Sequence, residues 1–162
     1  MRYNVKENLS DKALINWLIK DNNKELHTLI KVNSVRGSIV ERKIADDLNS
    51  KFTDLHGSDE VDLKGRIIET KMTKSTNQGV FEIGNVLSKK GKCHIIRVID
   101  LINFRMFEIP HDVFFMKNKG IKINKRGKKK ITDSFTFSAS YNKTDKKAPQ
   151  NTSLLLKYEV TQ

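Results

Sequence analysis

Cysteine is nearly absent from this chain, and so are long apolar runs. The single cysteine, Cys93, excludes an intrachain disulfide and a cysteine-rich zinc site. The four histidines show none of the spacings typical of zinc ligands, so we expect no structural zinc. No apolar stretch approaches the roughly 18 residues that a membrane-spanning helix needs, and residues 1–12 lack the apolar region of a secretion signal. We therefore expect a cytoplasmic protein with no membrane partner.

Acidic residues are scarce relative to basic ones. The chain has 19 Asp and Glu against 31 Lys and Arg, which gives a formal net charge of +12 and a pI near 9.8. Such an excess is typical of proteins that bind nucleic acid. The basic residues are spread along the chain rather than gathered on one amphipathic helix, which argues against a membrane-surface role. A basic globular protein without a nucleic-acid partner remains the alternative.

The 162 residues, 37% of them hydrophobic, are enough for one domain with its own core. Ser10 can cap a first helix, and the apolar residues between positions 14 and 30 indicate one interrupted helix or two short ones that end near residue 32. Their wide apolar faces can pack on the core or on a second subunit. Residues 34–52 predict a further helix, with Ile39, Val40 and Ile44 on one stripe.

After this helix the apolar spacing changes to period two. Residues 60–63 and 67–72 predict a β-hairpin, and residues 93–101 are apolar enough for a central strand. Pro110 is well placed to begin a short helix. Further strands are predicted at residues 104–109, 134–140 and 154–160. Helices followed by a mixed sheet predict an α+β fold or a mixed α/β layer fold.

The hairpin segment, residues 57–75, gathers acidic side chains in an otherwise basic chain: Asp59, Glu60, Asp62 and Glu69. Crowded carboxylates repel one another unless a cation lies between them, and a metal ion is the usual candidate. Strand residues two positions apart point to the same face, so Glu69 shares its face with Lys71.

The length of the turn decides which acid joins this face. If residues 64–66 form a three-residue loop, Asp59 lies directly across from Lys71 on the same face, and Asp62 points into water. A two-residue turn would shift the register by one and put Glu60 and Asp62 on that face instead. We favour Asp59, because two-residue turns prefer Asn-Gly or Asp-Gly.

These residue types suit phosphodiester cleavage. Mg²⁺ prefers one or two carboxylates plus water, and Asp59, Glu69 and the Thr70 carbonyl supply such a partial shell. Lys71 can orient an attacking water, help to deprotonate it and stabilise negative charge on the phosphate. We expect Mg²⁺ as cofactor, with Mn²⁺ able to substitute. The alternative is a solvated strand with a surface Glu–Lys pair, which leaves the concentration of acids unexplained.

The pattern Asp59, nine residues, then Glu69, Thr70 and Lys71 resembles the PD-(D/E)xK nuclease superfamily and, within it, the PvuII-like type II restriction endonucleases. Many superfamily members have proline before the first acid. This chain has Ser58 at that position, and the PvuII-like group also lacks the proline. The resemblance implies a restriction-endonuclease-like core with a mixed β-sheet flanked by helices. It also implies a homodimer that cuts double-stranded DNA at a specific site, leaves 5′-phosphates and works beside a cognate DNA methyltransferase.

The resemblance further implies a division of the chain. Residues 1–162 would form a single nuclease domain, with a helical dimerisation subregion at 1–32, a catalytic core at 33–116 and a basic DNA-recognition subregion at 117–162. Glu41 and Asp62 are candidate additional acids. The implied DNA contacts are Asn33, Ser34, Arg36, Gln78, Asn85, Gln150 and Asn151. Lys128, Lys129 and Lys130, from the basic run at 124–130, are candidate phosphate contacts.

Two other functions stay open. A Holliday-junction resolvase or a homing-type nuclease can share the same core and the "G-x-x-x-E-R" helix start seen at residues 37–42. A DNA-binding protein with a degenerate site would keep the basic surface without the cleavage chemistry.

Overall fold

The computed structural model describes residues 3–55, 58–73, 80–83, 90–115, 122–125, 133–138 and 157–160. Short helices form the N-terminal part. Helix α1 (Val5–Leu9) is followed directly by α2 (Asp11–Lys20), and two 3-10 turns, η1 (Lys24–His27) and η2 (Leu29–Lys31), lead to α3 (Asn33–Asp47). The predicted cap of α2 is confirmed, because Ser10 Oγ accepts a hydrogen bond from the Ala13 amide at 3.3 Å.

Helix α3 is shorter than the sequence predicted. It ends at Asp47, and Asn49 adopts a left-handed backbone conformation with φ of 51°. An asparagine tolerates this conformation at a helix end better than most residues do. The chain then continues as a strand, β1 (Lys51–Leu55), so the prediction of helix through residue 52 is wrong at its C-terminal end.

A five-stranded mixed sheet lies at the centre of the fold, with strand order β1-β2-β3-β5-β6. Its remaining strands are β2 (Ser58–Val61), β3 (Ile67–Thr73), β5 (Ile95–Asp100) and β6 (Arg105–Pro110). Strand β3 runs parallel to β5, while the other neighbours are antiparallel. Every residue of β5 is buried, which confirms the predicted central strand. The predicted fold class, a mixed sheet flanked by helices, is confirmed.

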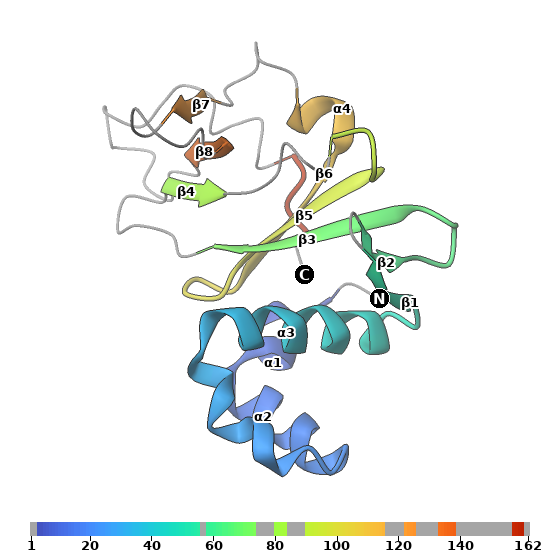
Figure 1. Cartoon of the computed structure of the whole chain (residues 1–162), viewed down its shortest axis with the longest axis vertical. Helices are drawn as coiled ribbons and strands as arrows, with labels where there is room; N and C mark the ends of the chain where they lie inside the picture. The colour runs from blue at the N-terminus through green and yellow to red at the C-terminus, as the bar shows by residue number, and fades with distance from the viewer. Residues whose placement is uncertain are drawn as a thin grey trace.

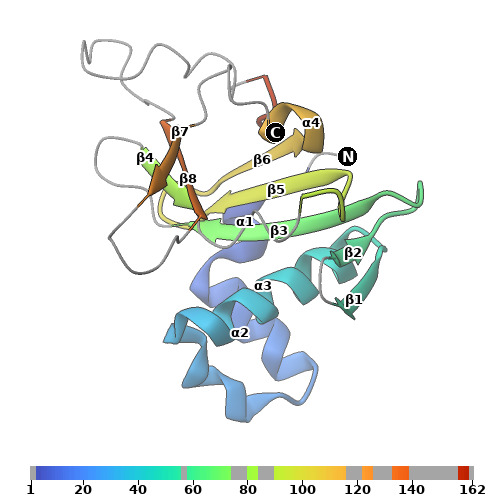
Figure 2. The same cartoon turned by 45° about the horizontal axis from the view of Figure 1, so that its top comes forward.

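The two faces of this sheet pack against different parts of the chain. Helices α1 to α3 cover one face, as Figures 1 and 2 show, where Leu14, Leu18 and Ile44 join Ile99 and Met106 in one apolar cluster. The N-terminal helices thus bury most of their apolar surface in the core of their own chain. Their exposed apolar residues are Ile19, Leu29 and Val32, each 42–46% exposed.

The opposite face carries the second apolar cluster. Val98 and Phe107 of the sheet pack there with Phe114 from α4 (His111–Phe114), a short helix that follows Pro110 as predicted. Residues 157–160 run beside β6, because the Glu108 amide donates to the Tyr158 carbonyl at 2.8 Å. Of the strand predicted at 154–160, the described residues 157–160 form only an isolated bridge between Phe107 and Glu159.

A small three-stranded sheet lies on the same side of β3 as α4, away from α3 (Figure 1). Its order is β4-β8-β7, with β4 (Val80–Ile83), β7 (Lys122–Lys125) and β8 (Asp133–Ser138). Strand β8 matches the strand predicted at 134–140, whereas β4 and β7 were not predicted. No helix in the described ranges has the length and apolar character required to cross a membrane.

Candidate active site

The acidic hairpin closes one residue earlier than expected. Val61 pairs with Ile67 and Glu60 with Ile68, and the Asp62 amide donates to the Arg66 carbonyl at 3.0 Å, which leaves residues 63–65 as a three-residue loop. The predicted loop length is confirmed, but its place at residues 64–66 is wrong, and the register differs from the predicted one by two positions. A shift of two leaves each side chain on its original face. Continued by one pair, the observed register puts Asp59 across from Glu69 rather than across from Lys71.

The side chain of Asp62 organises this turn. Asp62 Oδ1 accepts hydrogen bonds from the amides of Lys64 at 2.9 Å and Arg66 at 2.8 Å, and Oδ2 lies 2.7 Å from Arg66 Nε. Burial by itself raises the pKa of Asp62, but these donors and the Arg66 charge outweigh it and hold the pKa below its usual value. Asp62 thus does not point into water as predicted, and its carboxylate is committed to the turn.

Glu69 and Lys71 share the face of β3 that is turned away from α3, and alternation along β2 puts Asp59 on the same face, opposite to Glu60. The Thr70 amide donates to Asp59 Oδ2 at 2.6 Å, and Lys71 Nζ lies 2.5 Å from Glu69 Oε1. The side chain of Glu69 is fully buried, whereas that of Lys71 is 23% exposed. A carboxylate held in the interior beside an ammonium group with access to water is an arrangement that can serve hydrolytic chemistry.

The donor set at this place fits a small divalent cation. The register, continued by one pair, places Asp59 across from Glu69 on antiparallel strands, and Thr70 between Glu69 and Lys71 has a backbone carbonyl that can also bind a cation. In the part of the chain that the structure describes, no three His, Cys, Asp or Glu side chains form a metal-binding group. Mg²⁺ commonly binds through only one or two carboxylates and completes its shell with water, so two carboxylates are enough.

Glu60 points to the opposite face, where its carboxylate pairs with Arg97. Both residues are buried, and Arg97 also lies 2.8 Å from Glu108 Oε1. Burial by itself lowers the pKa of Arg97, but the two carboxylates outweigh it and raise the pKa above its usual value. Sequence reasoning missed this cluster, for which the only signal was a charged residue inside the apolar strand 95–100.

Glu41, the additional acid suggested on α3, lies on the helix side of the sheet. A Cβ placed on Gly37 would be 4.0 Å from Glu41 Oε1 and 3.7 Å from Met72 Cε, so these groups are close neighbours. Met72 alternates with Lys71 along β3 and points to the α3 face. The structure therefore does not bring Glu41 onto the face that carries Glu69 and Lys71.

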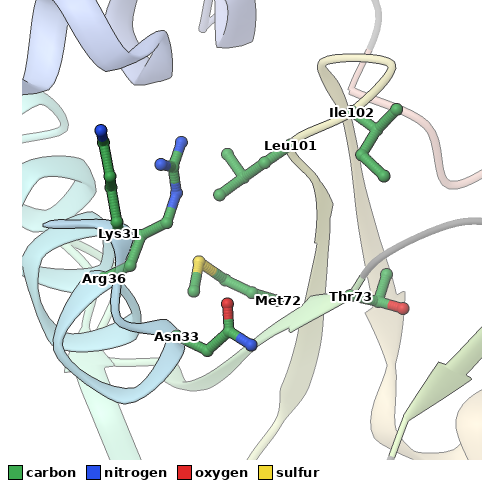
Figure 3. Close-up of a pocket in the computed structure, with 7 residues that line it drawn as sticks. All are labelled: Lys31, Asn33, Arg36, Met72, Thr73, Leu101 and Ile102. Carbon is green, nitrogen blue, oxygen red and sulfur yellow. The ribbon is translucent and has the colours of Figure 1, made fainter.

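Two of the predicted DNA contacts line a cavity beside the end of β3. Figure 3 shows Asn33 and Arg36 around this cavity, which has a volume of about 510 Å³. Met72 and Thr73, the residues that follow Lys71, form part of its wall. Arg36 is paired with Asp11 at 2.5 Å. The other lining residues are Lys31, Leu101 and Ile102.

Ser34 is exposed at the start of α3. The remaining predicted DNA contacts lie outside the described residues: Gln78, Asn85, Lys128, Lys129, Lys130, Gln150 and Asn151.

Comparison with known proteins gives a likeness in structure only. No protein-family model matches the sequence, and neither does any curated protein. Among solved structures, the chain is similar to a bacterial homing endonuclease, I-Ssp6803I, with a TM-score of 0.47 and 14% sequence identity. The match covers 82% of this chain and 86% of that chain. At this identity the likeness extends to the fold alone, and the chemistry has to be inferred from the residues themselves.

Proposed function

We propose that the protein is a Mg²⁺-dependent DNA endonuclease and, more specifically, a site-specific type II restriction endonuclease. The observation that carries this proposal is the pair of Lys71 Nζ and the buried Glu69 Oε1 at 2.5 Å, with the carboxylate of Asp59 hydrogen-bonded to the amide of the intervening Thr70. The net charge of +12 supports a polyanionic substrate.

Asp59 and Glu69 would hold the metal ion, together with the Thr70 carbonyl. Bound there, Mg²⁺ would neutralise charge that builds up on the phosphate oxygens. The Thr70 amide keeps the Asp59 carboxylate against β3, so the two acids are placed before the substrate arrives. Such preorganisation lowers the barrier because little rearrangement is needed during the reaction.

Lys71 would position the nucleophile. Its ammonium group is partly exposed and touches Glu69, so it can hold a water beside the phosphate and stabilise the negative charge that develops there. The water oxygen forms a bond to phosphorus, the bond from phosphorus to the 3′ oxygen breaks, and that oxygen takes up a proton. The products are a 5′-phosphate and a 3′-hydroxyl.

The cavity beside β3 supports contact with the DNA close to the cleavage site. Lys31 adds a cation to its wall, next to Asn33 and the end of the strand that carries Lys71. Cationic and amide side chains are typical of backbone and groove contacts. We assign base reading to Gln150 and Asn151 and phosphate binding to Lys128, Lys129 and Lys130, as the resemblance and the basic run suggest.

A homodimer completes the proposal, because two identical subunits related by two-fold symmetry read a palindromic site and cut both strands. A methyltransferase with the same site would then protect the host DNA. The competing enzyme is a homing-type nuclease or a Holliday-junction resolvase, and the competing binding protein would bind DNA without cutting it.

Incubation of the purified protein with Mg²⁺ and a long linear duplex separates these functions. A restriction enzyme gives a fixed ladder of fragments with 5′-phosphates from frequent short sites, whereas a homing-type nuclease cuts at most a few long sites. Cleavage of four-way junctions alone identifies a resolvase. Intact DNA in both assays, together with measurable binding, means that the nuclease proposal is wrong.

A further inference from the structure

Arg97 ties together three strands of the central sheet from the face that is turned toward α3. Its guanidinium pairs with Glu60 on β2 and with Glu108 on β6, while Arg97 itself belongs to β5. The contact to Glu60 involves both outer nitrogens, with Nη2 at 3.4 Å from Oε1. Strand β3 lies between β2 and β5, so the side chain of Arg97 crosses it.

This crossing happens at the residue that separates the two catalytic candidates of β3. Thr70 is the register partner of Arg97, and it stands between Glu69 and Lys71 in the sequence. The Thr70 amide, in turn, is the donor that binds Asp59 Oδ2. The side chain of Arg97 and the hydrogen bond to Asp59 therefore meet at the same position of β3.

Glu60 is the last regularly paired residue of β2 before Asp59. Strand β2 pairs with β3 at Glu60 and Val61, and this pairing stops just before Asp59. On the other side, β2 pairs with β1 at Glu60 and at Ser58, but the register shifts between these two positions. Glu60 is the residue next to Asp59, and alternation along the strand sends their side chains to opposite faces. When Arg97 holds Glu60 on the helix face, Asp59 has to emerge on the other face, across from Glu69.

We infer that Arg97, acting through Glu60, is a positioning residue that sets the place of the Asp59 carboxylate relative to Glu69 and Lys71. This inference rests on the proposed function for its catalytic meaning, but its structural content concerns the hydrogen bond between Asp59 and Thr70. A displacement of about 1 Å in a reacting group can cost about 100-fold in rate, so this ion pair controls turnover without touching the DNA.

Two isosteric variants of the same cluster form a matched pair. Glu60→Gln and Glu108→Gln each remove one carboxylate partner of Arg97, but only Glu60 lies beside Asp59. Hydrogen exchange of the Thr70 amide reads the Asp59 hydrogen bond directly, whether or not the protein cleaves DNA. We expect exchange at this amide to become about tenfold faster in Glu60→Gln and to stay within about twofold in Glu108→Gln. Asp59→Asn provides the reference for a weakened bond.

The kinetic readout is the division between kcat and KM at a temperature well below the unfolding midpoints of both variants. Glu60→Gln should lower kcat at least about tenfold with KM for DNA within about twofold, whereas Glu108→Gln should keep kcat within about threefold. Mn²⁺ that binds the folded protein should raise its thermal unfolding midpoint. Compared with wild type, this increase should be smaller in Glu60→Gln and unchanged in Glu108→Gln.

The outcomes separate the two proposals. Equal Thr70 exchange in the two variants would overturn the positioning role, whatever the activity. Faster exchange only in Glu60→Gln, in a protein that cuts no DNA, would support the positioning role and reject the proposed function. A wild-type nuclease whose kcat falls equally in both variants would show that the cluster acts only through general stability.

Discussion

The two faces of the β2–β3 hairpin use acidic side chains in opposite ways. On the helix face, Glu60 is 2% exposed and enclosed by the guanidinium of Arg97. On the other face, the buried Glu69 lies beside Lys71, whose side chain has access to water, and Asp59 accepts a hydrogen bond from the Thr70 amide. In the proposed function, neighbouring residues of one short acidic segment serve the sheet on one side and chemistry on the other, which would explain why the acids of a basic chain concentrate here.

The largest effect should come from substitutions on the face that carries Glu69 and Lys71. Glu69→Ala or Lys71→Ala should reduce Mg²⁺-dependent DNA cleavage at least about 1000-fold, because each removes a group that would contact the metal or the water. For Lys71→Ala, DNA binding in Ca²⁺ should be retained. Cleavage assays and circular dichroism check this prediction, and a folded variant with wild-type rates would remove the residue from the active site.

Substitution of Arg97, on the face turned toward α3, should instead lower the stability of the fold. Arg97→Met leaves Glu60 buried without its cation, a loss that typically costs about 3–5 kcal/mol in unfolding free energy. The control is Asp21→Asn, which removes the ion pair with Arg42 at 3.1 Å, whose side chains are 41% and 50% exposed, and should cost about 1 kcal/mol or less. Urea unfolding measures both. Similar costs for the two variants would mean that the Arg97 cluster is no more important than an ordinary surface pair.

A second pair of variants tests whether Asp59 or Asp62 binds the metal ion. Asp59→Asn should weaken Mn²⁺ binding and lower cleavage about 100-fold, whereas Asp62→Asn should leave cleavage within a few fold because Asp62 serves the turn. Calorimetric titration with Mn²⁺ and initial cleavage rates check the prediction. The reverse order of effects would assign the metal to Asp62.

The smallest expected effect concerns acid stability of the turn. Because the folded state holds the pKa of Asp62 below its usual value of 3.8, the ionised carboxylate stabilises the fold above that pH. This contribution is lost as pH falls through the lower pKa of the folded state. The stability difference between wild type and Asp62→Asn should therefore shrink below about pH 4, in urea unfolding series recorded from pH 6 downward. A constant difference would mean that Asp62 titrates normally.

The sequence predicted the elements that local patterns encode. Period-two spacing predicted β3, a nearly continuous apolar run predicted β5, the Ser10 cap predicted the start of α2, and Pro110 predicted the start of α4. Strand β1 was missed because the helical pattern of α3 was extended beyond Asn49, whose left-handed conformation follows the end of the helix. Local spacing alone does not mark the residue at which a helix stops.

The face of Asp59 could be predicted, but its exact register could not. Alternation along the strand puts Asp59 and Glu60 on opposite faces, whereas the position of the turn depends on side-chain hydrogen bonds of Asp62 that composition does not reveal. The Arg97 cluster lies further beyond reach, since its partners are 37 and 11 positions away in the sequence. Contacts of this kind exist only after the strands have been ordered in the sheet.

The parallel pairing of β3 with β5 also bears on how the protein folds. The β2–β3 and β5–β6 hairpins each join neighbouring segments, whereas the contact between Ile67 and His94 at the start of the parallel pair closes a separation of 27 positions. The entropy of closing that loop must be met before the contacts of the parallel ladder can form. We therefore expect the two hairpins to form early and to dock late, so that the strand carrying Glu69 and Lys71 gains its second neighbour only in the last steps of folding.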